Sequence, residues 1–269
     1  MSGQYQRQLS RNGMVGFSPQ RDEAVDAGTI GLFDFGHGWG YFEQVTPMAA
    51  ASQLRNYVRL GGAAVADTAV PWTGNMVKFD TVGQSITLPP ECRLPANCTD
   101  FAVAWWGKIP KTGYPSGGSG QKAGQVLGCA SGGFVQYTVS PLYDGATGNL
   151  NSVQLGINFE GPTVPASTFP DDNSAHHYLM RWRVVSATKA LLEFYIDGAL
   201  RFSTADLNYN GALAQPDRAP RLGQYWTNVP DALRGSIGRI VVQRLDIAGS
   251  KRLPAMLAAE IAAGRGRFS

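Results

Sequence analysis

Carboxylates at a fixed spacing are the residues that could do chemistry here, because hydrolysis of a glycosidic bond needs two of them about 5 to 10 Å apart. Residues two apart on a β-strand point to the same face, so a pair of carboxylates at that spacing, such as Glu-x-Asp, is what an enzyme built on a sheet could use. No Glu-x-Asp occurs in the chain. Glu193 and Asp197 are four apart, and Asp197 forms with Gly198 a pair typical of a turn. We therefore expect no catalytic residues and no enzymatic activity.

Histidines and cysteines do not form a recognisable site either. His176 and His177 are adjacent, so on a strand they would point to opposite faces and could not both bind one metal ion. Gly-x-Ser-x-Gly is absent, and the spacing of Ser, His and acidic residues predicts no nucleophile. The chain has three cysteines, an odd number, and no two of them form a Cys-x-x-Cys pair; they are Cys92, Cys98 and Cys129. The sequence predicts three free, buried thiols.

The elements that must position any site are β-strands. The 269 residues include 33 Gly and 16 Pro, dispersed among short runs rich in Val, Ile, Phe, Tyr and Trp. These runs recur at intervals of about ten residues, which is typical of an antiparallel sandwich or barrel. The sequence predicts an all-β sandwich over residues 29–269, preceded by an N-terminal arm over residues 1–28.

One helix is expected close to the C-terminus, where Pro254 can open it and Gly264 can close it. Its apolar stripe for packing on the sandwich is Leu253, Met256, Leu257, Glu260 and Ile261.

Charge and hydropathy narrow the range of partners. The net charge is +3, without the basic stripe that a phosphate backbone requires, so no nucleic-acid partner is expected. No run approaches the roughly 18 to 20 apolar residues of a membrane helix. The first residues lack the pattern of a secretory signal peptide, so we expect synthesis in a cytosol and no membrane insertion.

A tight hairpin is predicted for LLEFYIDGALRF, residues 191–202. Asp197 and Gly198 supply the two positive-φ residues of a type I′ turn. Alternation along the two strands assigns four side chains to the core, namely Phe194, Ile196, Leu200 and Phe202. This hairpin needs no chemistry to explain it, so its value is diagnostic of the fold.

Five motifs occur in a characteristic order, namely VKFDTVGQSITLPP, FAVAWWGKIP, HHYLMRWRVVSATKALLEFYIDGALRFS, PRLGQYW and LRGSIGRIVVQRLDI. Together they resemble the laminin-G-like group of the concanavalin A-like jelly-roll superfamily. The chain departs from the pattern in one strand, where His176-His177 is followed by Tyr178 and the tryptophan comes only at Trp182. The resemblance implies two curved antiparallel sheets packed face to face, whose concave face and rim loops bind sugars, proteins or calcium.

The resemblance also suggests where ligands would bind. Calcium is a common ligand at the rim, and Asp144, Asp171 and Asp172 could supply oxygen atoms from loops, although acidic residues are also ordinary turn residues. The expected cofactor is therefore none, with calcium as the alternative. Aromatic rings in loops could stack on sugars, and these candidates are Tyr114, Tyr143, Tyr209 and Trp226.

The two ends of the chain offer candidate subunit contacts. The arm is either disordered or ordered on a neighbouring subunit, with Met14, Val15 and Phe17 as its apolar anchors. At the other end Arg265 and Arg267 belong to a small basic excess that could contact an acidic neighbour.

The combination of a sandwich, no catalytic carboxylates and a polar arm resembles non-catalytic jelly-roll proteins of bacteriophage particles. The leading expectation is a virion structural component, in a decoration, tail, baseplate or fibre position, made in the host cytoplasm. Its partners would be other virion proteins, copies of itself and possible host-surface carbohydrate. A free carbohydrate-binding lectin-like module is the alternative, and a divergent glycoside hydrolase is a third hypothesis.

Overall fold

The computed structural model describes residues 22–36, 45–58, 61–114, 120–131, 134–158, 160–223 and 234–268. Within these ranges the chain forms two antiparallel sheets and one α-helix, which confirms the predicted all-β sandwich with a short C-terminal helix. Short 3-10 turns occur at η1 (Pro90–Cys92) and η2 (Ala166–Thr168). No helix in the described part of the chain is long and apolar enough to cross a membrane.

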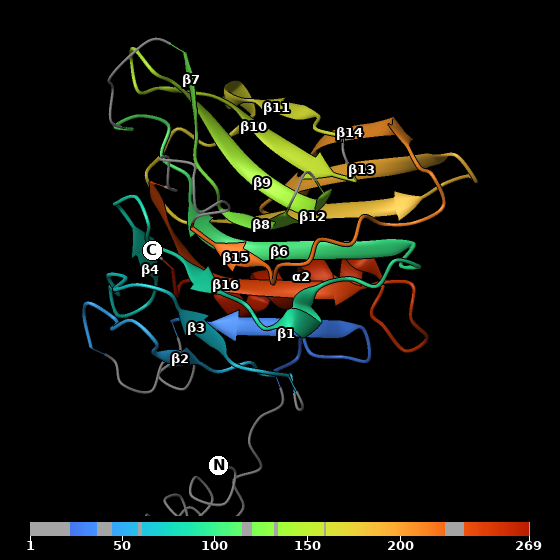
Figure 1. Ribbon diagram of the computed structural model, residues 1–269, viewed down its shortest axis with the longest axis horizontal. Coiled ribbons are helices and arrows are strands. Elements are labelled where there is room, and N and C mark those ends of the chain that lie inside the picture. Colours follow the sequence, from blue (N-terminus) through green and yellow to red (C-terminus); the bar gives the residue numbers. More distant parts are fainter. Residues whose placement is uncertain are drawn as a thin grey trace, which may run out of the picture.

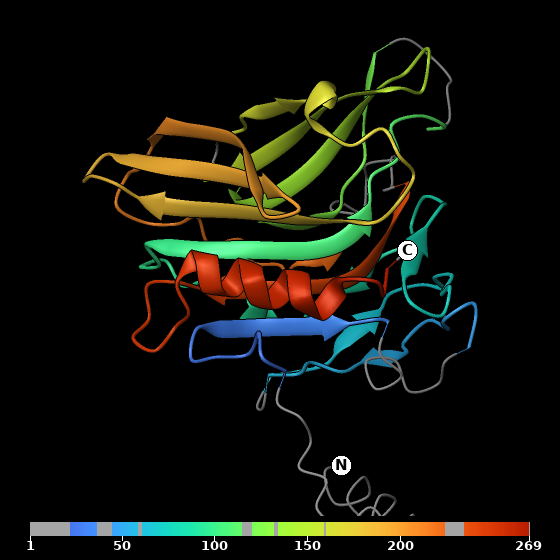
Figure 2. The same cartoon turned by 180° about the vertical axis from the view of Figure 1, so that it is seen from behind.

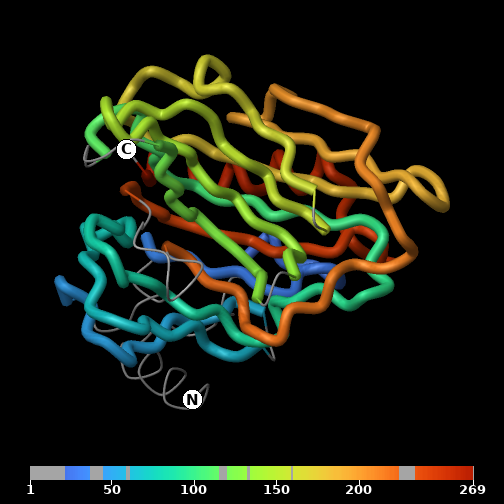
Figure 3. The backbone as a smooth tube through the Cα atoms, turned by 45° about the horizontal axis from the view of Figure 1, so that its top comes forward, coloured from blue at the N-terminus to red at the C-terminus, as the bar shows by residue number. Residues whose placement is uncertain are grey.

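The seven-stranded sheet runs from β14 at the top of Figure 1 to β1 at the bottom. Its order is β14 (Ala199–Asn208), β13 (Lys189–Ile196), β12 (His176–Val184), β6 (Asp100–Lys108), β16 (Gly235–Arg244) and β1 (Thr29–Asp34), with β4 (Val77–Phe79) also paired to β16. Strands from opposite ends of the chain thus lie side by side, as the blue and red segments of Figure 3 show for β1 and β16.

The nine-stranded sheet packs against the first. Its order is β11 (Thr163–Pro165), β10 (Leu150–Ile157), β9 (Phe134–Asp144), β8 (Leu127–Ser131), β15 (Arg221–Leu222), β5 (Ile86–Thr87), β3 (Ala64–Ala66) and β2 (Gln53–Leu54), with β7 (Gln121–Ala123) paired to β9. Alternate residues of both sheets fill the space between them. Aromatic rings form much of this core, for example Trp105 stacked on Tyr178 at 5.2 Å and Tyr178 on Phe194 at 6.2 Å.

The outer face of the seven-stranded sheet is covered by α2 (Leu253–Gly264), which lies between β6 and β1 in Figure 2. Ala102 and Ala104 of β6 are small enough to let the helix come close, and Met256 and Leu257 pack there. The indole N–H of Trp106 donates to the backbone oxygen of Glu260 at 3.0 Å. The helix is therefore anchored to the sheet by apolar packing and by a hydrogen bond.

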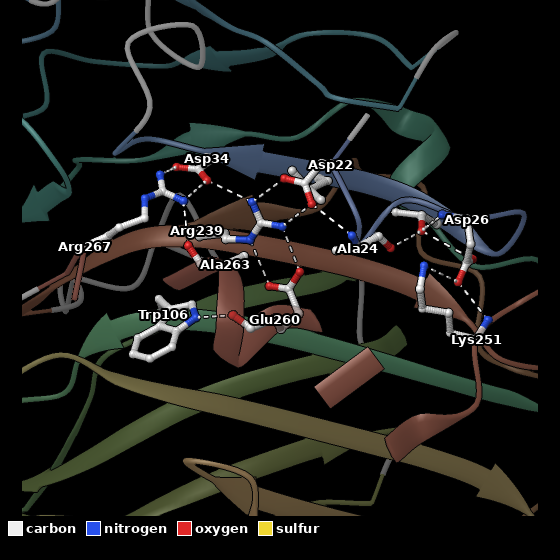
Figure 4. Close-up of polar contacts among 12 residues, drawn as sticks. Asp22, Ala24, Asp26, Asp34, Trp106, Arg239, Lys251, Glu260, Ala263 and Arg267 are labelled. Atoms are coloured by element: carbon white, nitrogen blue, oxygen red, sulfur yellow. Dashed lines mark hydrogen bonds and ion pairs between the residues drawn. The ribbon is translucent and has the colours of Figure 1, made fainter. Parts of the chain in front are cut away.

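Glu260 corrects the predicted apolar stripe of the helix, because its carboxylate is completely buried and ion-paired. Arg239 of β16 donates from Nε to Glu260 Oε2 at 3.0 Å and from Nη2 to Oε1 at 2.9 Å. The same guanidinium reaches Asp22 and Asp34, both at 2.8 Å (Figure 4). Burial opposes the charge of Arg239, but the surrounding carboxylates outweigh it and raise its pKa well above the ordinary value.

The predicted boundary of the arm at residue 28 is wrong, because residues 22–28 are part of the sandwich. Asp22 pairs with Arg239, and Ala24 is buried. The carboxylate of Asp26 accepts hydrogen bonds from Gln243 Nε2 and from the backbone N–H of Lys251. Burial would raise the pKa of Asp22, but Arg239 reverses this effect and lowers it. The proposed anchors Met14, Val15 and Phe17 lie outside the described residues.

The hairpin has the predicted turn, with positive φ at Asp197 (51°) and Gly198 (80°). Phe194 and Ile196 are buried as expected, but Leu200 is 52% exposed. A register shift in the β13–β14 pairing places Leu200 opposite Tyr195, which lies on the outer face. The bulge therefore turns Leu200 out of the core.

Candidate ligand-binding site

A row of three polar side chains crosses the outer face of the seven-stranded sheet near its edge. Ser236 of β16 pairs with Lys78 of β4 on one side and with Lys108 of β6 on the other. Residues directly opposite one another on neighbouring strands point to the same face. Val77 and Phe79 on either side of Lys78 are buried in the inter-sheet core, which fixes the lysine on the outer face. The register therefore places two cations on either side of a hydroxyl.

This row is one wall of a pocket of about 460 Å³, which we call the rim pocket. Its polar residues are Lys78, Asp80, Lys108, Thr112, Asn173, Arg234 and Ser236, and Phe79, Pro110, Gly113 and Gly235 complete it. Three cations and one carboxylate give the lining a net charge of +2. Lys78 Nζ lies 3.4 Å from Asp80 Oδ2, and the two side chains are 51% and 39% exposed, so water screens this pair.

Arg234 is held beside the rim pocket by an aromatic ring. Its Cζ atom lies 5.9 Å from the ring centroid of Tyr114, a cation–π contact. Its Nε is buried without a hydrogen-bond partner in the described residues. Tyr114 stacks in turn on Tyr143 at 4.4 Å. The guanidinium is thus oriented by a pair of stacked rings, not by a carboxylate.

The Asn173 side of the rim pocket belongs to a loop that His176 fastens to the hairpin. His176 Nε2 lies 2.6 Å from Asp172 Oδ1 and 3.1 Å from Ser174 Oγ, while Nδ1 lies 2.7 Å from Asp197 Oδ2. Burial alone would lower the pKa of His176, but the hydrogen bonds to the two aspartates outweigh it and raise the pKa. Both residues beside Asn173 are therefore bonded to one imidazole.

The same imidazole could be mistaken for a catalytic base, since Ser174, His176 and Asp197 are in contact as a nucleophilic triad would be. The nitrogen that faces the serine, Nε2, is already hydrogen-bonded to the carboxylate of Asp172. The two carboxylates beside the ring favour its protonated form. A protonated imidazole cannot accept the proton of a serine hydroxyl. The sequence did not reveal this cluster, because Asp197 reaches His176 only through the pairing of β12 with β13.

A second surface lies on the outer face of the nine-stranded sheet. A row across its strands runs from Arg221 through Gly128 and Thr138 to Gly156. A smaller pocket of about 220 Å³ lies there, lined by Thr138, Gly156 and neighbours that include the carboxylate of Glu160. The Arg221 guanidinium already donates to Thr87 Oγ1 at 3.2 Å. This surface has no comparable concentration of charge.

The predicted aromatic contacts are mostly buried. Tyr114 and Tyr143 are 6% and 0% exposed, so the expectation that they present open faces is wrong. Tyr143 lies in β9 instead of a loop and points into the core. Tyr209 is half-buried, edge-on to Trp182 at 5.6 Å. Trp226 lies outside the described residues.

The three predicted calcium ligands are not brought together. Asp144 Oδ1 accepts from the backbone N–H and hydroxyl of Thr147, a turn arrangement that lowers its pKa. Asp171 pairs with Lys111, and Asp172 with His176. Among the residues that the structure describes, no group of three or more His, Cys, Asp or Glu side chains could hold a metal ion.

The predicted basic contact at the C-terminus is also altered. Arg267 turns inward and donates from Nη2 to Asp34 Oδ1 at 2.7 Å and from Nη1 to Oδ2 at 2.9 Å. The guanidinium of this candidate subunit contact is therefore already paired with a carboxylate of its own chain. Arg265 is exposed.

No protein-family model matches the chain, and no curated protein matches it in sequence. Several solved structures resemble it. Trypanosoma rangeli sialidase in complex with sialic acid is 14% identical with a TM-score of 0.57, over 90% of this chain and 34% of the sialidase chain. The same enzyme in complex with 2,3-difluorosialic acid is 13% identical with a TM-score of 0.58, over 99% of this chain and 40% of the sialidase chain. The binding domain of botulinum neurotoxin serotype G is 12% identical with a TM-score of 0.48, over 87% of this chain and 51% of the toxin domain's chain.

The chain thus spans about a third to two-fifths of the length of the sialidase chains. At these identities the likeness concerns the fold alone. None of the structures named here is a bacteriophage protein, so the virion expectation gains no support from them. The chain is an antiparallel two-sheet β-sandwich with a short C-terminal helix.

Proposed function

We propose that this protein is a non-catalytic, carbohydrate-binding module that takes its ligand in the rim pocket. The observation that carries the proposal is the pocket itself, about 460 Å³ in volume and open between strand ends and loops. Ligand sites of proteins commonly measure about 300 to 1,000 Å³ and combine apolar walls with a few polar groups. The hydroxyls of Thr112 and Ser236 and the amide of Asn173 suit sugar hydroxyls, while Pro110 is apolar.

The lining of the rim pocket favours binding over hydrolysis. A glycosidase needs two carboxyl groups on either side of the scissile bond. Asp80 is the only carboxylate among the lining residues that the structure describes. The sialidase structures named above hold sialic acid or a derivative, and this chain resembles them in fold, which is compatible with a sugar ligand. No contact described above favours a bacteriophage-particle role instead.

The test is a glycan array probed with the full chain, followed by calorimetry on the best ligand. Ser236→Trp would fill the rim pocket, and Ser203→Trp places the same side chain on exposed β14 as a matched control. We expect Ser236→Trp to abolish binding and Ser203→Trp to retain it, with both variants showing the wild-type circular dichroism spectrum. If Ser236→Trp does not fold, Thr112→Trp blocks the pocket from an exposed loop position. Binding that survives a folded, blocked pocket would contradict the proposal.

A further inference from the structure

Among the described residues, one carboxylate faces the three cations of the rim pocket. Lys108 and Arg234 make no ion pair with any described residue. By contrast, Arg181 is paired with both Asp100 and Glu193. A net charge of +2 in a concave site raises the local concentration of anions, because low-dielectric walls focus the field. The pocket is therefore arranged for a ligand that brings negative charge.

The register of the strands shows where that charge would lie. Lys78 and Lys108 are each one strand away from Ser236, so their Cα atoms are about 10 Å apart. Both have long, flexible stems and can converge on a group seated above the Ser236 hydroxyl. Gly235 lets its strand approach β6 closely beside this row, because a Cβ atom there would meet the backbone oxygen of Lys108. Two ammonium groups and a hydroxyl can thus surround one small anion.

Asp80 distinguishes a sugar acid from a simple anion. It lines the same pocket and repels a ligand that is negative on every side. Its exposed pair with Lys78 is weak enough to open, which leaves the carboxylate free to accept hydrogen bonds from sugar hydroxyls. A polyphosphate has no hydroxyls to donate there. A saccharide with one carboxylate and several hydroxyls fits both halves of the lining.

We infer that the rim pocket selects carboxylated saccharides over neutral ones. Lys78 and Lys108 bind the carboxylate from either side of Ser236, and Arg234 supplies a third cation. This inference rests on the proposed function and names the class of ligand for the same site.

The experiment compares each acid with its own neutral methyl ester, which removes the charge and adds one methyl group at each carboxyl. Trigalacturonic acid and 6′-sialyllactose are titrated calorimetrically into the full chain, each beside its ester. We expect at least one acid to bind about tenfold tighter than its ester at low salt, as charge-assisted hydrogen bonds predict. The difference should shrink as ionic strength rises to about 0.5 M.

Variants of the two lysines test whether these residues cause the preference for the acid over its ester. Lys78→Gln and Lys108→Gln should each lower the affinity for the acid by about three- to tenfold and leave the affinity for the ester unchanged. Lys122→Gln and Arg201→Gln, which remove the same charge outside the pocket, are matched controls and should change neither. Equal affinity for both acids and their esters would overturn the inference while leaving a carbohydrate-binding module. A sulfated ligand preferred on the array over every carboxylated one would also overturn it. Absence of any glycan binding would instead refute the proposed function.

Discussion

Arg239 and Glu260 form a bidentate ion pair to which water has no access, both side chains being 0% exposed. The pair joins β16, which lies between β1 and β6 in the seven-stranded sheet, to α2 on its outer face (Figure 4). Asp22 and Asp34 complete the coordination of the guanidinium, so the segment before β1 is fastened by the same group. One arginine thus holds both ends of the described chain against the sheet.

Removing that arginine should destabilise the fold severely. Arg239→Met leaves three carboxylates with their main counter-charge gone, and an uncompensated buried charge costs about 3 to 5 kcal/mol. Glu260→Gln should cost less, because Asp22 and Asp34 still neutralise Arg239. Urea unfolding with an unchanged m-value measures both.

Lys189→Gln is the control for this experiment, since it breaks the exposed Lys189–Asp206 pair and should cost about 0 to 1 kcal/mol. A stability loss for Arg239→Met as small as that of the control would contradict the role of the buried cluster.

His177 should make the fold sensitive to acid. Burial beneath α2 lowers the pKa of His177 to about 4. Between pH 6.5 and 4 the unfolded chain therefore binds a proton that the folded chain refuses, so stability falls as the pH falls through this range. The loss is about 3 kcal/mol, from a difference of roughly 2.5 pH units. His177→Leu should show a flatter dependence of unfolding free energy on pH, and an unchanged slope would refute this assignment.

His176 should act in the opposite direction, because its pKa is raised and not lowered. Its stabilising hydrogen bonds to Asp172 and Asp197 are fully present below pH 6.5 and are lost as the pH rises through the folded pKa. Hydrogen exchange of residues 171–175, corrected for intrinsic rates, should accelerate on this rise. In His176→Gln the corrected exchange should be fast at every pH. A wild-type loop whose exchange does not respond to pH would show that the imidazole does not fasten it.

The thiols should be inert in the native state. All three cysteines are free and buried, and burial raises the pKa of Cys98 and Cys129 to about 12 and that of Cys92 as well. The reactive thiolate is therefore scarce at neutral pH. A disulfide reagent at pH 8 should modify none of the three until denaturant is added, after which all three should react. Rapid modification of one thiol in folded protein would contradict the burial described here.

Patterns within single strands predicted the fold correctly, but contacts between distant strands did not follow from them. The Asp-Gly turn and the alternation around Phe194 are local and could be read directly. Leu200 could not, because the bulge that exposes it belongs to the pairing of two strands. Glu260 carried a signal that was available, since a carboxylate at a core position of a helix implies a buried counter-charge.

The rim pocket lay beyond sequence reasoning for the same reason. Lys78, Lys108 and Ser236 are far apart in the chain, and each looks like an ordinary polar residue near a strand end. Only the registers of β4 and β6 on β16 align them. A loop position near a strand end does not imply exposure, because Tyr114 packs on Tyr143 beneath Arg234.

The most direct test of a rim pocket that binds acidic saccharides is an NMR titration of the full chain, labelled with ¹⁵N, with trigalacturonic acid and 6′-sialyllactose. The account predicts that amide shifts concentrate at Lys108, Asn173 and Ser236, and that Lys78→Gln reduces them. Shifts confined instead to Thr138 and Gly156, on the outer face of the nine-stranded sheet, would contradict it.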